Sequence, residues 1–288
     1  MRAAGDSELK VYGIFGYPLA HTVSPAIHNR AFDYHKLKSL YFAFERPPAR
    51  FHFLMRNLKK LILDGFNVTI PFKEVIIPYL DRLDPIASAI GAVNTVKKEG
   101  TKWIGCNTDA AGFLAGLRET NFSPRAKTAV ILGAGGGARA VIYALAAKKA
   151  GKIVVANRTQ AKARALVRRF QKMFSKIEWI STDIHETNLK AALKEADILV
   201  NTTSVGLKPN DSSLVSKAMF PDRKILVCDL IYRPRRTRLL LTARKLGNRI
   251  LNGEAMLLHQ GAKAFEVWTH RKAPVEIMRK ALRDALGT

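Results

Sequence analysis

Residues 128–159 read TAVILGAGGGARAVIYALAAKKAGKIVVANRT. The apolar run 128–132 predicts a buried strand, and a second apolar run, 153–156, follows after enough residues for one helix. Between them, Gly133, Gly135 and Ala138 have the G-x-G-x-x-G/A spacing. Such a turn brings backbone N–H groups and a helix N-terminus up to a pyrophosphate. The stretch therefore predicts a βαβ unit that binds a dinucleotide.

The end of the second strand indicates which dinucleotide is bound. A site for NAD usually offers a carboxylate to the ribose 2′-hydroxyl about 20 residues after the glycines. Here that position holds Asn157 and Arg158, and no acid. Because an arginine attracts a 2′-phosphate, the sequence favours NADP. The residues expected at this part of the cofactor site are Gly133, Gly135, Gly136, Gly137, Ala138, Asn157, Arg158 and Thr159.

The composition bounds the class of protein. A chain of 288 residues can form one or two domains with a sizeable core. It contains no signal-peptide pattern and no run of about 18 apolar residues, so no membrane segment is expected. The two cysteines, Cys106 and Cys228, form neither a disulfide framework nor a zinc-binding spacing. We therefore expect no metal site and a reduced, cytoplasmic setting.

The net charge of +25 is unusual for a chain of this size. Ten Lys and Arg residues lie between Lys148 and Lys176, where no acid occurs. Ala163, Leu166 and Phe170 recur in this stretch at helical spacing, which predicts an amphipathic helix with its basic residues on the solvated face. No recognised nucleic-acid motif accompanies the charge, so binding to RNA or DNA is the less favoured interpretation.

Strands and helices alternate along the chain, which predicts an α/β fold with a mostly parallel sheet. Ser24 followed by Pro25 predicts a helix start, with the serine as N-cap. A hairpin is expected from residues 92–97 and 102–106. Other predicted strands are 11–15, 40–44, 65–70, 198–201 and 225–229, and a helix is predicted around residues 50–63. We expect a substrate and catalytic domain at 1–109, an NADP-binding Rossmann domain at 110–252, and C-terminal helices at 253–288 that return to the first domain.

Two residues have the chemistry needed to reduce a ketone, which requires a proton donor beside the carbonyl. Lys73 follows the predicted strand 65–70, and we expect it in the first turn of a helix, where the macrodipole disfavours a second positive charge. Asp109 ends a strand segment beside the expected domain boundary and could hold the lysine in place. By spacing alone, Lys73 could equally be a solvated helix residue and Asp109 an N-cap.

Seven motifs together resemble the shikimate dehydrogenase family. They occur in the family's order and cover nearly the whole chain. The resemblance implies reduction of 3-dehydroshikimate to shikimate by NADPH, a step toward aromatic amino acids, with Lys73 and Asp109 as the catalytic pair. The motifs are GYPLAHTVSP at 16–25, NVTIPFK at 67–73, GAVNT at 91–95, NTD at 107–109, GAGGGAR at 133–139, NRT at 157–159 and GEAMLLHQ at 253–260.

The resemblance also implies further site residues. It implies a small-molecule substrate and no membrane partner, and it leaves a homodimer open. The implied substrate-binding residues are Thr22, Ser24, Thr69, Asn94, Tyr232 and Gln260. The residues implied to line the nicotinamide and its ribose are Thr203, Ser204, Leu230, Gly253 and Met256.

At some positions the sequence departs from the family's usual residues, and other functions therefore stay open. Thr22 stands where the family usually has serine, which retains a hydroxyl but adds a methyl group and leaves quinate as an alternative substrate. Cys106 stands where an acid is common, but hydride transfer needs no thiolate. An RNA-associated protein akin to glutamyl-tRNA reductase would need a catalytic cysteine near the N-terminus, and none precedes Cys106. An NADP sensor without turnover is a further alternative.

Overall fold

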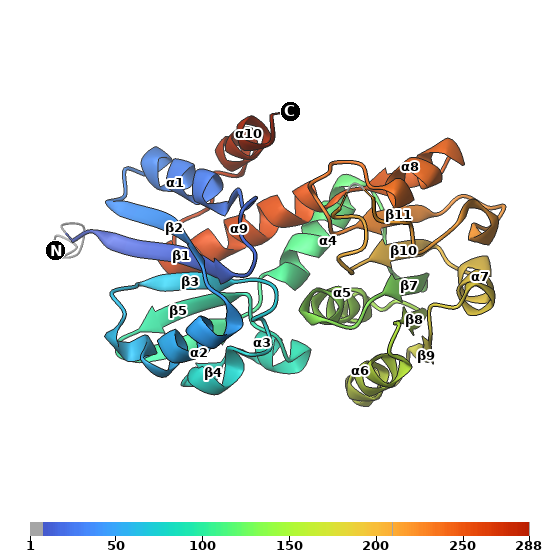
Figure 1. The fold of residues 1–288 in the computed structure, drawn as a ribbon, viewed down its shortest axis with the longest axis horizontal. Helices are drawn as coiled ribbons and strands as arrows, with labels where there is room; N and C mark the ends of the chain where they lie inside the picture. The colour runs from blue at the N-terminus through green and yellow to red at the C-terminus, as the bar shows by residue number, and fades with distance from the viewer. Residues whose placement is uncertain (1–7, 209, 288) are drawn as a thin grey trace. The chain divides into compact units, whose positions relative to one another are not determined.

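The computed structural model describes residues 8–208 and 210–287. The chain forms two compact units, one of residues 1–108 and 258–288, and one of residues 109–257. Each unit contains one six-stranded sheet (Figure 1). The prediction of two α/β folds is therefore confirmed, and the C-terminal segment from Leu258 onward belongs to the first unit.

Unit 1 has a mixed sheet of β1 (Lys10–Gly16), β2 (Ser39–Glu45), β3 (Gly65–Val68), β4 (Arg82–Leu83), β5 (Thr95–Glu99) and β6 (Lys102–Cys106). Their order is β2-β1-β3-β5-β6-β4. β1 pairs in parallel with β2 and β3, whereas β5 is antiparallel to both β3 and β6. The predicted hairpin is thus β5–β6, and it makes this sheet mixed rather than purely parallel.

Helices cover both faces of the unit 1 sheet. Phe51 and Met55, from α2 (Pro48–Arg56), pack with Phe66 and Trp103 of the strands in one apolar core. On the opposite face lie α1 (Ser24–Tyr34) and the second half of α9 (Gly253–Thr269), whose Trp268 donates its indole N–H to the Val96 carbonyl at 2.9 Å. The remaining helices are α3 (Pro85–Ile90), α10 (Val275–Leu286) and the 3₁₀ turns η1 (Leu58–Lys60) and η2 (Ile77–Tyr79).

Unit 2 has a wholly parallel sheet of β7 (Thr128–Leu132), β8 (Lys152–Ala156), β9 (Glu178–Thr182), β10 (Ile198–Asn201), β11 (Leu226–Asp229) and β12 (Arg249–Leu251). The order is β12-β11-β10-β7-β8-β9. Counted from β7 as the first strand, this is the 3-2-1-4-5-6 order of a Rossmann fold. Its topological switch point, where ligands bind in such sheets, lies between the carboxyl ends of β7 and β10.

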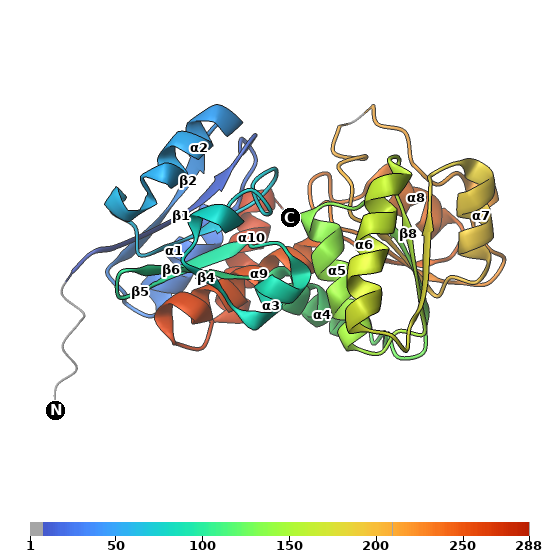
Figure 2. The same cartoon turned by 90° about the horizontal axis from the view of Figure 1, so that it is seen from below.

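The helices of unit 2 form two layers around this sheet. Leu193 of α7 (Glu186–Lys194) and Leu240 of α8 (Arg238–Lys245) pack on one face, against Val130 and Leu199. Helices α5 (Gly136–Ala147) and α6 (Gln160–Met173) cover the other face (Figure 2). The remaining elements are α4 (Asp109–Glu119) and the 3₁₀ turn η3 (Lys217–Met219).

The prediction of a helix beginning at Phe72–Lys73 is wrong. Residues 70–76 form turns that run into η2, and no α-helix of the described chain begins before α3 in this segment. The Lys73 carbonyl accepts a hydrogen bond from Val93 N–H at 2.7 Å rather than from the next helical turn. Pro78, which has no N–H, also prevents continuation of a helix. The macrodipole argument for Lys73 therefore does not apply.

Two other boundaries differ in detail. Ser24 is the first residue of α1, and the N-cap is Val23, which offers no side-chain acceptor. The helix expected at 50–63 is split into α2 and η1. Among the helices in residues 8–208 and 210–287, none has the length and apolar character needed to cross a membrane.

Candidate active site

The glycine turn lies at the carboxyl end of β7. Gly133 has φ +111°, a conformation that favours glycine, and a Cβ there would lie 2.5 Å from the Thr202 hydroxyl oxygen. A Cβ on Gly135, by contrast, would meet nothing within 4 Å. Gly135 is also the N-cap of α5 and offers no side-chain acceptor to its first N–H groups. The turn therefore presents open space and helix N–H donors, which suit a pyrophosphate.

The segment after β10 lies beside this turn. The Thr202 hydroxyl donates to the Leu132 carbonyl at 2.6 Å, and a Cβ on Gly133 would lie 3.1 Å from Thr203 Cγ2. The Thr203 hydroxyl donates to Asn201 Oδ1 at 2.7 Å, whereas Ser204 is exposed. The structure thus places Thr203 next to the glycine turn, at the switch point of the sheet.

The carboxyl end of β8 carries Arg158, which is exposed. Its neighbour Asn157 is half-buried and donates from Nδ2 to the Thr159 carbonyl at 2.9 Å, which closes the loop into α6. The adjacent strand β9 is followed by Asp183, but that carboxylate accepts from His185 N–H and from Nδ2 of Asn188, at the start of α7. These hydrogen bonds lower the pKa of Asp183, the one to Asn188 contributing most. The residues at this edge fit a phosphorylated ribose.

A close backbone approach joins the end of β11 to the start of α9. A Cβ on Gly253 would overlap the Leu230 carbonyl oxygen, so no larger residue fits there. A Cβ on Gly137 would lie 3.3 Å from Leu230 Cδ1. Gly137, Leu230 and Gly253 are therefore brought together around the first turn of α5. Met256 is half-buried one turn further along α9.

A buried polar network not foreseen from the sequence holds these strand ends. Asp229 accepts from Asn201 Nδ2 at 3.1 Å, from Ile231 N–H at 3.1 Å and from the Thr237 hydroxyl at 2.7 Å. Burial raises the pKa of Asp229 to about 6, although these hydrogen bonds oppose the shift. The sequence does contain a signal for this network. Each of two apolar strands ends in a polar residue, Asn201 in β10 and Asp229 in β11.

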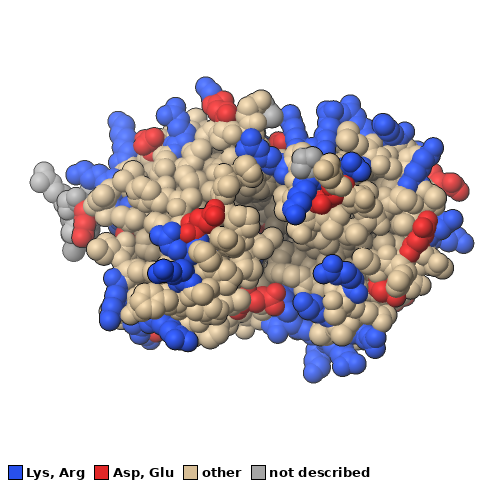
Figure 3. Space-filling model, viewed as in Figure 1, with Lys and Arg blue, Asp and Glu red and all other residues tan. Residues whose placement is uncertain are grey.

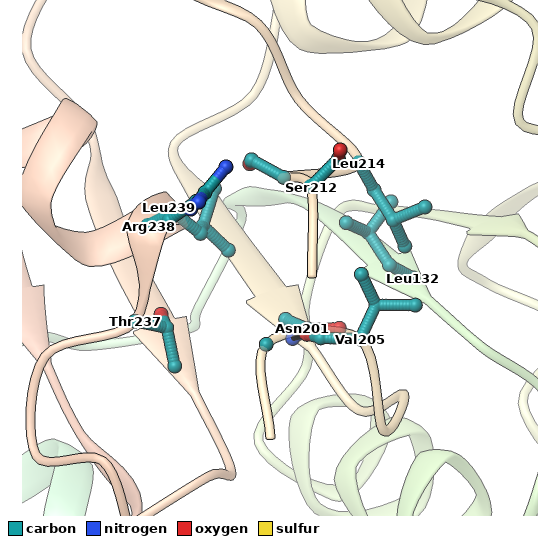
Figure 4. Close-up of a pocket in the computed structure, with 10 residues that line it drawn as sticks. Leu132, Asn201, Val205, Ser212, Leu214, Thr237, Arg238 and Leu239 are labelled. Carbon is teal, nitrogen blue, oxygen red and sulfur yellow. Dashed lines mark hydrogen bonds between the residues drawn. The ribbon is translucent and has the colours of Figure 1, made fainter. Parts of the chain in front are cut away.

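A small cavity adjoins this network (Figure 4). Its volume of about 10 Å³ corresponds to about one water molecule, so it is too small for a substrate. Asn201 and Thr237 line it together with Ser212 and Leu214 of the loop after β10. The cavity therefore belongs to the packing that holds this loop.

In unit 1, the predicted hydroxyl residues meet at the start of α1. The Thr22 and Ser24 hydroxyl oxygens lie 3.4 Å apart, and Thr22 is half-buried while Ser24 is buried. Thr69 follows β3, and its N–H donates to the Phe15 carbonyl at 2.9 Å. A Cβ on Gly16 would lie 2.5 Å from Thr69 Cγ2, which places Thr69 against the end of β1.

Asn94 lies at the centre of a second polar network. Its Nδ2 donates to Gln260 Oε1 at 3.1 Å and to the Thr108 hydroxyl at 2.9 Å, and its Oδ1 accepts from Thr108 N–H at 2.8 Å. Because Thr108 precedes Asp109, Asn94 also holds the chain on which Asp109 is carried. Asn67, whose role the sequence motif does not indicate, donates to the Asn94 carbonyl and accepts from Tyr41 Oη at 2.7 Å.

The remaining predicted residues belong to different units. Lys73 is half-buried in unit 1, whereas Asp109, buried in the first turn of α4, and Tyr232, half-buried after β11, belong to unit 2. Burial raises the pKa of the Tyr232 hydroxyl. It also raises the pKa of the Cys106 thiol to about 12, which disfavours the thiolate and a nucleophilic role.

A larger hollow of about 340 Å³ in unit 1 lies elsewhere. It is lined by charged residues that include Arg82, Lys97 and Glu266, and by none of the predicted substrate residues. Within residues 8–208 and 210–287, no group of three His, Cys, Asp or Glu side chains could hold a metal ion.

Comparison with known proteins gives the family. Residues 14–96 match the shikimate dehydrogenase substrate binding domain, residues 117–237 match shikimate / quinate 5-dehydrogenase, and residues 253–283 match the shikimate 5'-dehydrogenase C-terminal domain. A shikimate dehydrogenase (NADP(+)) of Methanopyrus kandleri is 45% identical over 286 residues, which cover 98% of this chain and 97% of the relative. The chain belongs to the shikimate dehydrogenase family. The predicted family and its oxidoreductase class are confirmed.

Solved structures of shikimate dehydrogenases have the same fold. The enzyme of Thermus thermophilus, in complex with NADP(H) and shikimate, has a TM-score of 0.84 at 34% identity and covers 96% of this chain and 100% of that one. A quinate dehydrogenase of Corynebacterium glutamicum in complex with NAD has a TM-score of 0.86 at 28% identity over 96% of this chain and 99% of that one. Both substrates therefore occur among proteins of this fold.

Proposed function

We propose that this member of the shikimate dehydrogenase family reduces 3-dehydroshikimate to shikimate reversibly and uses NADP. The observation that carries the substrate side is the hydrogen bond from Asn94 Nδ2 to Gln260 Oε1, which joins residues 166 positions apart in one unit. Both residues correspond to substrate-binding positions of the family. Their amide groups can hydrogen-bond the hydroxyls of a polyhydroxylated ring.

The cofactor side rests on the carboxyl edge of the unit 2 sheet. The open space at Gly135 and the first N–H groups of α5 fit a pyrophosphate, and the exposed Arg158 fits a 2′-phosphate. Thr203, Leu230 and Gly253 lie around the same edge, where a nicotinamide and its ribose would be held. When bound, NADPH supplies the hydride.

In the proposed substrate site, Thr22 and Ser24 bind the carboxylate. Their hydroxyls lie at the N-terminal end of α1, where the helix dipole also favours an anion. Thr69 and Asn94 bind ring hydroxyls together with Gln260, and Tyr232 is a further proposed substrate-binding residue. These contacts orient the ketone for attack on one face.

Lys73 and Asp109 are the proposed catalytic pair. As the ketone carbon takes up the hydride, its oxygen gains negative charge, and the Lys73 ammonium donates a proton to that oxygen. The Asp109 carboxylate holds this ammonium in position. In the reverse direction the neutral Lys73 amine takes the proton from the hydroxyl, so the same pair serves both directions.

An absorbance assay of NADP reduction tests the proposal. We expect the purified protein to reduce NADP with shikimate, faster than with quinate and faster than it reduces NAD. Binding of NADPH without turnover of either acid would identify an NADP sensor instead and would contradict the enzymatic function.

Quinate dehydrogenase is the second candidate. It is favoured by Thr22, which stands in place of the family's usual serine and changes the shape of the proposed carboxylate site by one methyl group. Equal turnover of shikimate and quinate in the same assay would favour an enzyme with both activities.

A further inference from the structure

The excess positive charge is largest in the unit that carries the proposed cofactor site. Residues 109–257, which form unit 2, contain 27 Lys and Arg against 11 Asp and Glu. Residues 120–177, from the end of α4 to the start of β9, contain 13 Lys and Arg and no acid at all. The second half of this segment contains helix α6.

Helix α6 separates its apolar and basic residues cleanly. Leu166, Val167 and Phe170 are buried against the sheet, as the periodicity predicted. Arg164, Arg168 and Lys172 are exposed and follow one another at four-residue intervals, so they form one row along the solvent side of the helix, about 12 Å long. Lys and Arg side chains gather over α6 at the lower edge of Figure 3.

The row of Arg164, Arg168 and Lys172, called the basic row below, lies on the helix that directly follows Arg158. Helix α6 starts at Gln160, two residues after Arg158, and runs back from the carboxyl edge of the sheet. Its N-terminus, the positive end of the helix dipole, therefore lies at the proposed 2′-phosphate site. Arg164 is the member of the row nearest to this end in sequence, and Lys172 is the farthest.

We propose that the basic row of α6, Arg164, Arg168 and Lys172, is a collecting surface that attracts the phosphate groups of the incoming dinucleotide and raises its rate of association. This inference rests on the proposed NADP site at the glycine turn and Arg158. The row acts over a distance on the approaching ligand and makes no direct contact with the bound one. It gives the basic charge of unit 2 a kinetic role.

The effect depends on ionic strength and on ligand charge. Exposed charges interact over a Debye length of about 30 Å at 0.01 M salt, about 8 Å at 0.15 M and about 3 Å at 1 M. The row is therefore within reach of the site at low salt and screened at high salt. NADPH carries one more phosphate than NADH, so it is attracted more strongly.

Stopped-flow association rates test the proposal. The double variant Arg164→Gln/Arg168→Gln removes two charges from the row and keeps good helix formers. At about 0.01 M salt we expect the association rate constant for NADPH to fall about three- to tenfold, with a smaller loss for NADH. At about 1 M salt the variant and the parent protein should agree within about 1.5-fold, and the dissociation rate constant should be unchanged at both.

The variant Arg244→Gln/Lys245→Gln is the matched control. It removes two exposed charges from α8, which connects β11 to β12 at the other edge of the same sheet. An equal loss of association rate in this control would show an effect of net charge alone and would overturn the proposal. A faster dissociation in the α6 variant would also overturn it, because that result indicates a direct contact.

Two further outcomes separate this inference from the proposed function. If the row has no effect while Arg158→Ala still weakens NADPH, the cofactor site stands and only the collecting surface is wrong. If the parent protein does not bind NADPH, both fail. Binding of a single-stranded RNA 20-mer at about 0.15 M salt that is lost in the α6 variant would instead make the row a nucleic-acid site.

Discussion

Asn201 and Asp229 end neighbouring strands of the unit 2 sheet and share a buried hydrogen bond, from Asn201 Nδ2 to Asp229 Oδ1 at 3.1 Å. Asn201 Oδ1 in turn accepts from the Thr203 N–H and hydroxyl, and Asp229 accepts from Ile231 N–H. The two loops that carry Thr203 and Leu230 are therefore held by one pair of side chains.

This pair predicts a specific dependence of stability on pH. The pKa of Asp229 rises from 3.8 to about 6 because of burial, so between these pH values the unfolded state loses its proton first. The free energy of unfolding should therefore fall as pH rises through this window, by about 3 kcal/mol from this residue, and then stay level. Urea unfolding of Asp229→Asn and the parent protein, compared across the window, measures this contribution.

The free energy of unfolding of Asp229→Asn minus that of the parent should accordingly be higher above pH 6 than below pH 3.8. The exposed Asp222→Asn is the control for loss of one carboxylate. A difference between Asp229→Asn and the parent that does not vary with pH would contradict the buried, ionisable role of this residue.

Gly135→Ala should weaken the cofactor without weakening the fold. A Cβ at this position meets no protein atom within 4 Å, so the free energy of unfolding should change by less than about 1 kcal/mol. The methyl group would occupy space assigned to the pyrophosphate, and the dissociation constant of NADPH should rise at least about tenfold. Fluorescence titration and thermal unfolding measure the two effects.

Gly253→Ala is the contrasting variant. Its Cβ would overlap the Leu230 carbonyl oxygen, so we expect loss of more than about 2 kcal/mol of stability even without cofactor. Equal stability losses in the two variants would show that the space around Gly135 is not reserved for a ligand.

Arg158→Ala should weaken the binding of NADPH far more than the binding of NADH. A charge-assisted hydrogen bond to phosphate contributes about 1.5–3 kcal/mol, so the dissociation constant of NADPH should rise about 10- to 100-fold. The constant for NADH, which lacks the 2′-phosphate, should change by less than about twofold. Isothermal titration of both cofactors provides the measurement, and an equal loss for both would place Arg158 outside the 2′-phosphate site.

Lys73→Ala and Asp109→Asn should lower kcat by about 10²- to 10⁴-fold, the contribution expected of general acid–base groups. Binding of NADPH should persist in Lys73→Ala because Lys73 lies in unit 1 and the glycine turn in unit 2. Steady-state kinetics with shikimate and NADP measure kcat. A kcat within about threefold of the parent would remove these residues from the proposed catalytic pair.

Thr22 should influence the choice of substrate. We expect kcat/KM to favour shikimate over quinate by about 10²-fold, because the additional quinate hydroxyl needs a partner that the pocket must supply. Thr22→Ser retains the hydroxyl and restores the serine that is usual in the family, so the preference for shikimate over quinate should rise, by about tenfold. Parallel kinetics on the two acids decide the matter, and a variant with an unchanged preference would place the specificity elsewhere.

The local sequence was sufficient to predict those elements that depend only on neighbouring residues. The glycine turn, the strands β7 and β8 and the buried face of α6 follow from glycine conformations and from apolar spacing within about 45 residues. The two α/β units and the family also followed from motifs in the sequence, and both are confirmed.

Lys73 shows where local propensity fails. Its segment has apolar residues at helical spacing, but the Val93 N–H takes the Lys73 carbonyl as its acceptor, and the segment becomes a turn. A hydrogen bond between residues 20 positions apart thus outweighs a weak helical preference. No spacing pattern in the sequence contains that information.

By itself the sequence determined the α/β class, the dinucleotide turn, the absence of an acid beside Arg158 and the family. Only the tertiary structure decided that Asn94 meets Gln260, that Asn201 meets Asp229, and that Gly253 makes room for the Leu230 carbonyl. These pairings join residues distant in the chain, because buried polar groups must find partners wherever the packed strands place them. Periodicity records which face of an element is buried, but not which distant residue it meets there.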